Sequence, residues 1–146
     1  MNMPTRHASA LWNGSLQQGT GMMSTGSGVL KAPFDTGSRL GDKGGTNPDE
    51  LIGAAHAGCF SMALSMLLGE IGIDNPEINS DADVTIEQTD GGLAITGIAL
   101  RTRVKAKGIS EDEFQDVAKA AKDNCPVSKA LAGTKITLSA ELETAA

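Results

Sequence analysis

The alternation of hydrophobic and polar residues predicts several short strands in the first third of the chain. Positions 8–12 alternate, Asn13-Gly14 is a strong hairpin signal, and residues 16–25 form a second, weaker strand interrupted by glycines. Gly26-Ser27-Gly28 then turns the chain into a short stretch at 29–31. Together these stretches predict a small antiparallel sheet.

Two stretches near these strands lack any alternation. Residues 1–6 have the pattern of a loose end, and residues 32–46 are rich in glycine and proline and are predicted to form a loop. Arg39 lies within that loop, between Ser38 and Leu40. Loops held by a rigid scaffold often carry function, so Arg39 is a candidate functional residue.

A long helix is predicted next. Asn47 can cap it, Pro48 fits its first position, and Glu50 completes a capping box. Asp49 and Glu50 also lie where the helix dipole favours negative charge. The following 19 residues, 51–69, contain no charged side chain, and as a helix they would extend about 28 Å.

A membrane-spanning role for this helix is disfavoured by its flanks. Acidic residues border the run, no Lys or Arg lies within the fifteen residues after Gly69, and no aromatic belt is present. A helix that is apolar all round is instead expected to be buried all round. One core of 146 residues is too small to enclose it easily, which predicts an obligate homodimer. Small residues would let the two backbones approach closely, namely Gly53, Ala54, Ala57 and Gly58.

The second half of the chain continues with a hairpin. Residues 83–88 alternate, a turn follows at Asp90-Gly91-Gly92, and the returning strand changes its buried parity at Gly97, as a β-bulge requires.

A helix and a final strand complete the pattern. Ser110 and Glu113 form a second capping box before a helical stripe of Phe114, Val117, Ala118 and Ala121. That helix ends before Cys125-Pro126, a short helix covers 126–132, and residues 136–142 alternate as a last strand. The order of elements predicts a single α+β domain over residues 1–146, with antiparallel sheets around the long buried helix.

Composition narrows the function. The net charge is −6, aromatic residues are only 3% of the chain and Tyr is absent, so nucleic acid is excluded as a partner. No secretory signal is visible, and two cysteines in a chain of this length do not form a disulfide scaffold. We therefore expect a cytoplasmic protein with no membrane partner.

The two cysteines are the main candidates for chemistry. Cys59 lies within the long helix, where a lone cysteine is usually a small buried hydrophobe. Cys125 directly precedes Pro126 and so begins a new helix, where free N–H groups and the dipole favour a thiolate. The two thiols are 66 residues apart and could meet only through the fold.

His56 lies three residues before Cys59, on nearly the same helix face. It could be the general base of a Cys nucleophile, or the two could form half of a zinc site. With two histidines in the chain, four zinc ligands would require His56, Cys59, Cys125 and a carboxylate, an unusual set. A histidine hydrogen-bonded to a carbonyl or hydroxyl is favoured over either, and no metal or other cofactor is predicted.

Three motifs carry a family resemblance: Gly45-Thr46-Asn47-Pro48, then Cys59-Phe60-Ser61-Met62-Ala63-Leu64, then Cys125-Pro126-Val127-Ser128. At this separation they resemble the OsmC/Ohr family of organic hydroperoxide reductases, most closely its OsmC (osmotically inducible protein C) branch. The similarity extends from Trp12 to the final strand, and so covers nearly the whole chain.

The resemblance implies an OsmC-like fold in an intertwined homodimer with two thiol peroxidase sites at the interface. It implies that Cys59 is the peroxidatic thiol, Cys125 the resolving thiol and Arg39 the cation beside Cys59. The family often has Glu after Asn-Pro, paired with the Arg, whereas here Asp49 follows and Glu50 is a possible substitute. Since Asp49 lies about 15 Å along the helix from Cys59, it must act through Arg39 or from the other subunit.

The implied chemistry is reduction of an organic hydroperoxide in oxidative or osmotic stress defence. A Cys59 thiolate gives a sulfenic acid, Cys125 condenses with it to a disulfide, and an external dithiol, for example of the lipoyl type, reduces the disulfide. Apolar residues on the Cys59 side of the helix would favour alkyl hydroperoxides, although plain core packing explains them equally well: Ile52, Ala55, Met62, Ala63 and Met66.

Two other functions remain open from the residues alone. A hydrolase or acyltransferase built on Cys59 and His56 would make Cys125 dispensable. A non-catalytic dimer that binds an apolar ligand or senses oxidation would show no peroxide turnover.

Overall fold

The computed structural model describes residues 3–144. Residues 1–2 of the predicted loose end, and residues 145–146 of the predicted domain, lie outside the described residues. The chain forms two compact units, one up to Leu51 and one from Ile52 onward. A single domain over the whole chain therefore stays a prediction.

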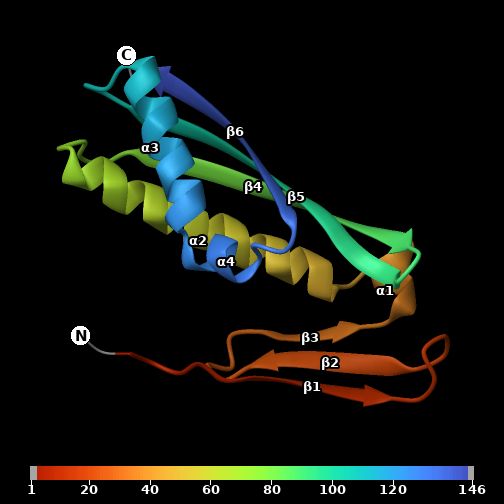
Figure 1. The fold of residues 1–146 in the computed structure, drawn as a ribbon. Helices are drawn as coiled ribbons and strands as arrows, with labels where there is room; N and C mark the ends of the chain where they lie inside the picture. The colour runs from red at the N-terminus through yellow and green to blue at the C-terminus, as the bar shows by residue number, and fades with distance from the viewer. Residues whose placement is uncertain (1–2, 145–146) are drawn as a thin grey trace. The chain divides into compact units, whose positions relative to one another are not determined.

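The first unit contains a three-stranded antiparallel sheet in the order β1–β2–β3 (Figure 1). The strands are β1 (Ala8–Asn13), β2 (Thr20–Thr25) and β3 (Lys31–Phe34), and the one-turn helix α1 (Thr36–Leu40) follows.

A glycine lets two aromatic rings meet across this sheet. Gly21 pairs with Trp12 on one side and Phe34 on the other. The ring centroids of Trp12 and Phe34 are 5.4 Å apart, and a Cβ at Gly21 would lie 2.5 Å from the Phe34 ring. Because any side chain at Gly21 would push the rings apart, glycine is required there.

Several predicted boundaries in this unit were wrong. The second strand begins at Thr20 and not at residue 16, because the Gly19 N–H donates to the Ser15 carbonyl at 2.7 Å and closes a turn. The stretch 32–46 is not all loop, since most of β3 and all of α1 lie within it. A proline is tolerated in β3 because that strand lies at the edge of the sheet.

The long helix α2 (Pro48–Glu70) confirms the predicted element. Asn47 Oδ1 accepts a hydrogen bond from the Glu50 N–H at 2.8 Å, as a cap should. In the predicted capping box the Glu50 side chain would bond back to the Asn47 backbone N–H. The Glu50 carboxylate instead accepts a hydrogen bond from the Thr46 hydroxyl at 2.9 Å.

A single chain buries α2 on one side only, so the burial of this helix on all sides stays a prediction for the proposed dimer. One stripe is fully buried, with Phe60, Leu64 and Leu68 at 0% exposure. The opposite face is open, with Met62 76% and Met66 60% exposed. A chain of this size has too small a core to cover every side of a long apolar helix. By length and composition alone α2 could cross a membrane, and 28% of its most apolar window is buried.

The second unit places α2 and two further helices beside a second three-stranded sheet (Figure 1). Its elements are β4 (Glu77–Thr89), β5 (Gly92–Ala106), α3 (Glu111–Asn124), α4 (Pro126–Ala130) and β6 (Lys135–Thr144). β4 begins six residues before the predicted residue 83.

The prediction of antiparallel sheets was only partly right. β4 and β5 are antiparallel, but β5 and β6 are parallel. Helices α3 and α4 connect β5 to β6, and a helical crossover of this length returns the chain in its original direction. The predicted bulge is confirmed, because Thr85 pairs with Gly97 and Ile86 with Ile95, which leaves Thr96 as the extra residue.

The core of the second unit lies between α2, α3 and β5. Ser110 caps α3 by accepting from the Glu113 N–H at 3.2 Å, which fixes the start of the helix. The predicted stripe of α3 then faces the core, where Phe114, Ala118 and Ala121 are fully buried. Cys125 belongs to the same buried cluster, and Cys59 packs against it.

Candidate active site

The fold of the second unit brings the two thiols together. Cys59 lies midway along α2 and is half-buried, whereas Cys125 is 0% exposed at the junction of α3 and α4. Both cysteines are free, Cys59 packs against the buried cluster that contains Cys125, and each thiol shifts the pKa of the other. Two thiols 66 residues apart in sequence are therefore neighbours in space.

The junction between α3 and α4 sets the position of Cys125. Its backbone N–H donates to the Ala121 carbonyl at 3.0 Å and ends α3, while Pro126 begins α4. The N–H groups of Val127 and Ser128, in the first turn of α4, lie near the Cys125 sulfur and lower the pKa of its thiol. This arrangement confirms the prediction that Cys125 begins a helix where a thiolate is favoured.

The two thiols differ in acidity. Burial, followed by the hydrogen bond with Cys125, raises the pKa of Cys59, and the Val127 N–H offsets this only in part. Burial also opposes ionisation of Cys125, but hydrogen bonds from Cys59, Ser128 and Val127 outweigh it and lower the pKa of that thiol. Within the second unit the negative charge therefore favours Cys125.

His56 is fully buried on α2, where burial lowers its pKa and keeps the ring neutral. Its Nε2 lies 2.7 Å from the Ser128 hydroxyl oxygen. Its Nδ1 has no hydrogen-bond partner among the described residues. The preferred prediction of a histidine bonded to a hydroxyl is confirmed, and the ring makes no hydrogen bond to Cys59 as a general base would.

The first unit contains the charged pair. Arg39 lies on α1, not in a loop, and forms a two-point ion pair with Asp49: Nε to Oδ2 is 3.1 Å and Nη2 to Oδ1 is 3.2 Å. The Asp49 side chain is only 8% exposed and that of Arg39 is 38% exposed. Asp49 therefore reaches Arg39 in spite of its shorter side chain, and Glu50 does not replace it.

Hydrogen bonds around α1 hold this ion pair together. Asp35 caps α1, with Ser38 completing the capping box. The Ser38 hydroxyl donates to the Thr46 carbonyl at 2.8 Å, and the Asn47 amide donates to the Ser38 carbonyl at 3.2 Å. These bonds fasten α1 to the beginning of α2, which sets Arg39 against Asp49.

The apolar residues predicted around Cys59 have different environments. Ile52 and Ala63 are half-buried, and Ala63 packs against the core. Ala55, Met62 and Met66 lie on the exposed face of α2. Core packing therefore explains only part of the predicted set. The other residues are apolar side chains on the exposed surface of one chain.

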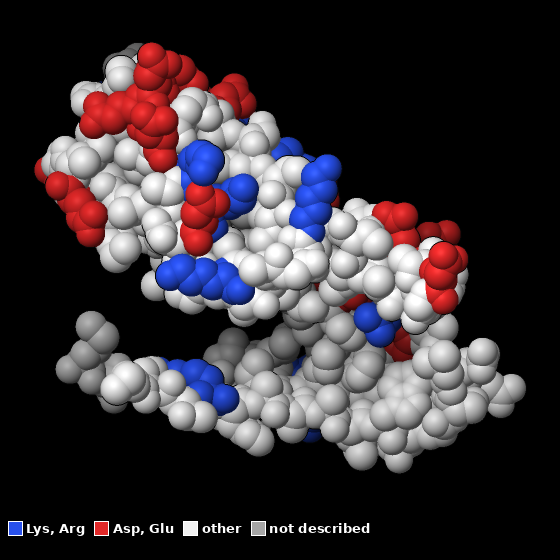
Figure 2. All heavy atoms as spheres, viewed as in Figure 1, with Lys and Arg blue, Asp and Glu red and all other residues white. Residues whose placement is uncertain are grey.

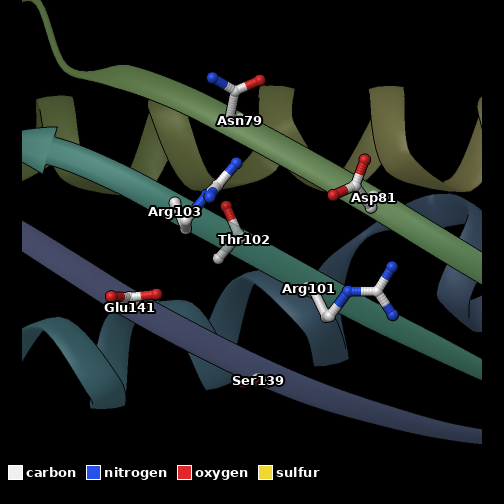
Figure 3. A pocket seen from close by; sticks show the side chains of 7 residues that line it. All are labelled: Asn79, Asp81, Arg101, Thr102, Arg103, Ser139 and Glu141. Carbon is white, nitrogen blue, oxygen red and sulfur yellow. The ribbon is translucent and has the colours of Figure 1, made fainter.

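A hollow of about 260 Å³ on the open face of the second sheet contains no thiol (Figure 3). Asn79 and Asp81 from β4 and Arg101 and Arg103 from β5 line it, and Arg101 pairs with Asp83. Figure 2 shows Lys and Arg together with Asp and Glu on the side of this unit that faces the viewer in Figure 1. This surface is a solvated sheet face.

Within residues 3–144 no three His, Cys, Asp or Glu side chains gather as metal ligands would.

Ser128 is the site residue that sequence reasoning missed. It is the last residue of the Cys125-Pro126-Val127-Ser128 motif, but the family resemblance implied no role for it. A signal was available, because a serine three residues after a helix-starting residue can turn its hydroxyl back toward that residue. Its contact with His56, 72 residues away, requires the fold.

Comparison with known proteins agrees with this geometry. A family model described as OsmC-like protein matches residues 41–139. The chain is 47% identical over 135 residues to peroxiredoxin OsmC of Escherichia coli strain K12, covering 92% of this chain and 94% of that protein. It is 33% identical over 108 residues to an organic hydroperoxide resistance protein of Xanthomonas axonopodis pv. citri, covering 72% and 74%.

A solved structure extends the match to the fold. The crystal structure of an organic hydroperoxide resistance protein from Elizabethkingia anophelis aligns with a TM-score of 0.79 at 25% identity, covering 97% of this chain and 99% of that one. The fold is of the α+β class, and the core of its second unit contains two cysteines that interact with each other. The chain belongs to the OsmC-like family, which confirms the resemblance found in the sequence.

Proposed function

We propose that this protein is a cysteine-based peroxidase that reduces organic hydroperoxides to alcohols in oxidative or osmotic stress defence. The observation that carries the proposal is the contact between two free thiols, one half-buried and one fully buried, inside an apolar core. The names of the E. coli and Xanthomonas relatives support the same activity.

The exposure of the two thiols supports Cys59 as the thiol of the first step, because Cys125 has no exposed surface. The Cys59 thiolate attacks the terminal peroxide oxygen, the O–O bond breaks, and the alkoxide takes a proton to leave as an alcohol. The Cys125 thiolate then attacks the sulfenic sulfur and displaces hydroxide, which leaves as water, and a disulfide forms. An external dithiol, for example of the lipoyl type, restores both thiols.

The first step requires an ionised Cys59 thiol, although Cys59 is the less acidic of the two cysteines. We propose that Arg39, oriented by Asp49, supplies the positive charge that favours a Cys59 thiolate. The ion pair supports this role, since a two-point contact fixes the plane of the guanidinium.

The assembly we propose is a homodimer, with the exposed face of α2 as part of the interface. Met62 and Met66 give this face apolar side chains that are 76% and 60% exposed in one chain. Covering such a face is what drives stable association. We propose a cytoplasmic location, where dithiol reductants are kept reduced, and neither nucleic acid nor membrane as a partner.

The rival functions have less support. A Cys–His hydrolase needs His56 beside Cys59, but His56 Nε2 bonds Ser128 and Nδ1 bonds no described residue. A ligand-binding dimer gives no reason for a second thiol beside the first. A redox sensor would also use a thiol pair, and repeated turnover of peroxide distinguishes the peroxidase from it.

Cysteine substitutions test the assigned roles. Cys59→Ser should abolish peroxide consumption, whereas Cys125→Ser should allow one turnover and leave Cys59 oxidised. Consumption of cumene hydroperoxide per protein thiol measures both. Equal residual turnover in the two variants would contradict the assignment.

A further inference from the structure

His56 and Ser128 connect α2 to the resolving thiol through buried atoms. His56 is 0% exposed and Ser128 is 6% exposed. The Ser128 hydroxyl is 2.7 Å from His56 Nε2. Ser128 also lies in the first turn of α4, three residues after Cys125, and its side chain lowers the pKa of the Cys125 thiol. The proposed reaction uses neither side chain, although Ser128 lies beside the resolving thiol and His56 is bonded to Ser128.

The position of the ring proton determines what Ser128 can do. A neutral imidazole has one N–H, and a hydroxyl can donate only one hydrogen. If the proton were on Nδ1, a buried N–H would have no acceptor, because Nδ1 has no partner among the described residues. A proton on Nε2 instead has the Ser128 oxygen as its acceptor. Orphaned buried N–H groups are rarer than unfilled acceptors, so the Nε2–H tautomer is favoured.

We propose that His56 and Ser128 are positioning residues for Cys125: the His56 Nε2–H donates to the Ser128 hydroxyl, and that hydroxyl donates its own hydrogen to the Cys125 thiolate. The relay rests on the proposed function for its biological purpose. It deepens that function, because it identifies which sulfur leaves when the disulfide is reduced.

The direction of reduction follows from burial. Since Cys125 is fully buried and Cys59 is half-buried, an external dithiol reaches the Cys59 sulfur. One dithiol sulfur bonds to Cys59, the Cys59–Cys125 bond breaks, and its electron pair leaves on Cys125. The second dithiol sulfur then displaces Cys59 and closes the reductant's own disulfide. The relay stabilises the sulfur that leaves first.

The test is the redox equilibrium of the Cys59–Cys125 disulfide in the full-length protein, measured in mixtures of reduced and oxidised dithiothreitol. At a pH where Cys125 is ionised, Ser128→Ala should make reduction about tenfold less favourable, since one hydrogen bond to a charged sulfur is lost. Tenfold corresponds to about 30 mV. At an acidic pH where both thiols are protonated, the variant and the wild type should converge.

Other charges near Cys125 do not explain why the redox equilibria of the variant and the wild type converge at acidic pH. Among the described residues, the titratable groups shown to interact with Ser128 or Cys125 are His56 and Cys59, both on α2. On α3 and α4 the nearest charged residues in sequence are Lys122, Asp123 and Lys129, and each is present unchanged in both proteins compared.

A matched control separates the relay from packing. Thr102→Val removes another buried hydroxyl, in the Ser61–Ser80–Thr102 hydrogen-bonded row, without touching either thiol. It should leave the redox equilibrium unchanged at both pH values. If Thr102→Val shifts the equilibrium as much as Ser128→Ala does, the relay is wrong.

His56 variants test the direction of donation, and they do so even if Ser128→Ala fails to fold. His56→Gln keeps an N–H donor and should stay near the wild type, whereas His56→Leu should make reduction less favourable. If His56→Leu makes reduction more favourable, Ser128 donates to the histidine and the relay is overturned. The ¹⁵N shifts of the wild-type ring should show the Nε2–H tautomer, and the other tautomer would overturn it equally.

Failure of the relay and failure of the proposed function are distinguishable. An unchanged redox equilibrium in Ser128→Ala overturns the relay while peroxide turnover continues. A wild type that equilibrates with dithiothreitol, shows the predicted shifts and yet consumes no cumene hydroperoxide supports the relay and contradicts the peroxidase.

Discussion

Cys59 and Cys125 differ in the property that decides which of them an outside molecule can reach. Cys125 is completely buried and has the lowered pKa, whereas Cys59 is half-buried and has the raised pKa. Solvent access therefore favours Cys59 as the reacting sulfur, whereas acidity favours Cys125. A peroxidase of this design needs an added positive charge to move ionisation toward Cys59, which is the role proposed for Arg39.

Substitution of Arg39 tests that role. Arg39→Met keeps the apolar stem but removes the charge, and Arg39→Lys keeps the charge but loses the fork that holds Asp49. We expect Met to be worse than Lys and both to fall well below the wild type, with about tenfold less thiolate for each unit of rise in the Cys59 pKa. The pH dependence of Cys59 alkylation is the measurement.

The control for this series is His56→Gln. Because His56 bonds Ser128 and not Cys59, the alkylation curve of Cys59 should not move. If His56→Gln shifts the curve while Arg39→Met does not, the Cys–His mechanism replaces the peroxidase.

His56 should also make stability depend on pH. Burial lowers its pKa from the ordinary 6.5, so the unfolded chain takes up this proton first as the pH falls. The contribution of neutral His56 is complete above 6.5 and is lost below it, down to the folded-state pKa, at no more than about 1.4 kcal/mol per pH unit. Urea unfolding of wild type and His56→Gln at several pH values should show a flatter profile for the variant.

At the scale of elements, the ends of helices were the most predictable features. Asn47 and Ser110 cap α2 and α3 as their sequence positions indicated. The bulge beside Gly97 was predictable too, because the buried parity of the strand changes there. Each of these features depends on residues close together in sequence.

Elements fixed by distant contacts were less predictable. β4 extends back to Glu77 because its neighbour β5 continues to Ala106, and polar residues on the open sheet face hid this from the pattern. The parallel β5–β6 pairing depends on where the α3–α4 crossover returns. At the site, the cysteines were evident from their motifs, but the partners of His56 and Arg39 required the fold.

The cap of α3 gives a prediction for a single element. Ser110→Ala removes the acceptor of the Glu113 N–H and should reduce the free energy of unfolding by about 1 kcal/mol. Ser139→Ala makes the same chemical change on the exposed face of β6, and should stay within about 0.5 kcal/mol of the wild type. Denaturant unfolding of both variants measures the difference. Equal losses would show that the cap does not stabilise α3.

At the scale of the whole molecule, the uncovered face of α2 predicts a dimer. Met62→Lys places a charge on that face and should shift the protein toward monomers, because burying an unpaired charge is costly. Val29→Lys makes a comparable change at a residue that is 90% exposed in a turn, and should leave the assembly intact. Sedimentation at micromolar concentration measures both, and a monomeric wild type would refute the proposed assembly.

The central claim is that the two thiols act as a pair on an organic hydroperoxide. Reduced protein should be treated with one equivalent of cumene hydroperoxide, digested without reduction and analysed by mass spectrometry. The account predicts one intramolecular disulfide between Cys59 and Cys125, with cumyl alcohol as the product. Unmodified thiols, or Cys59 oxidised without Cys125 under the same conditions, would contradict it.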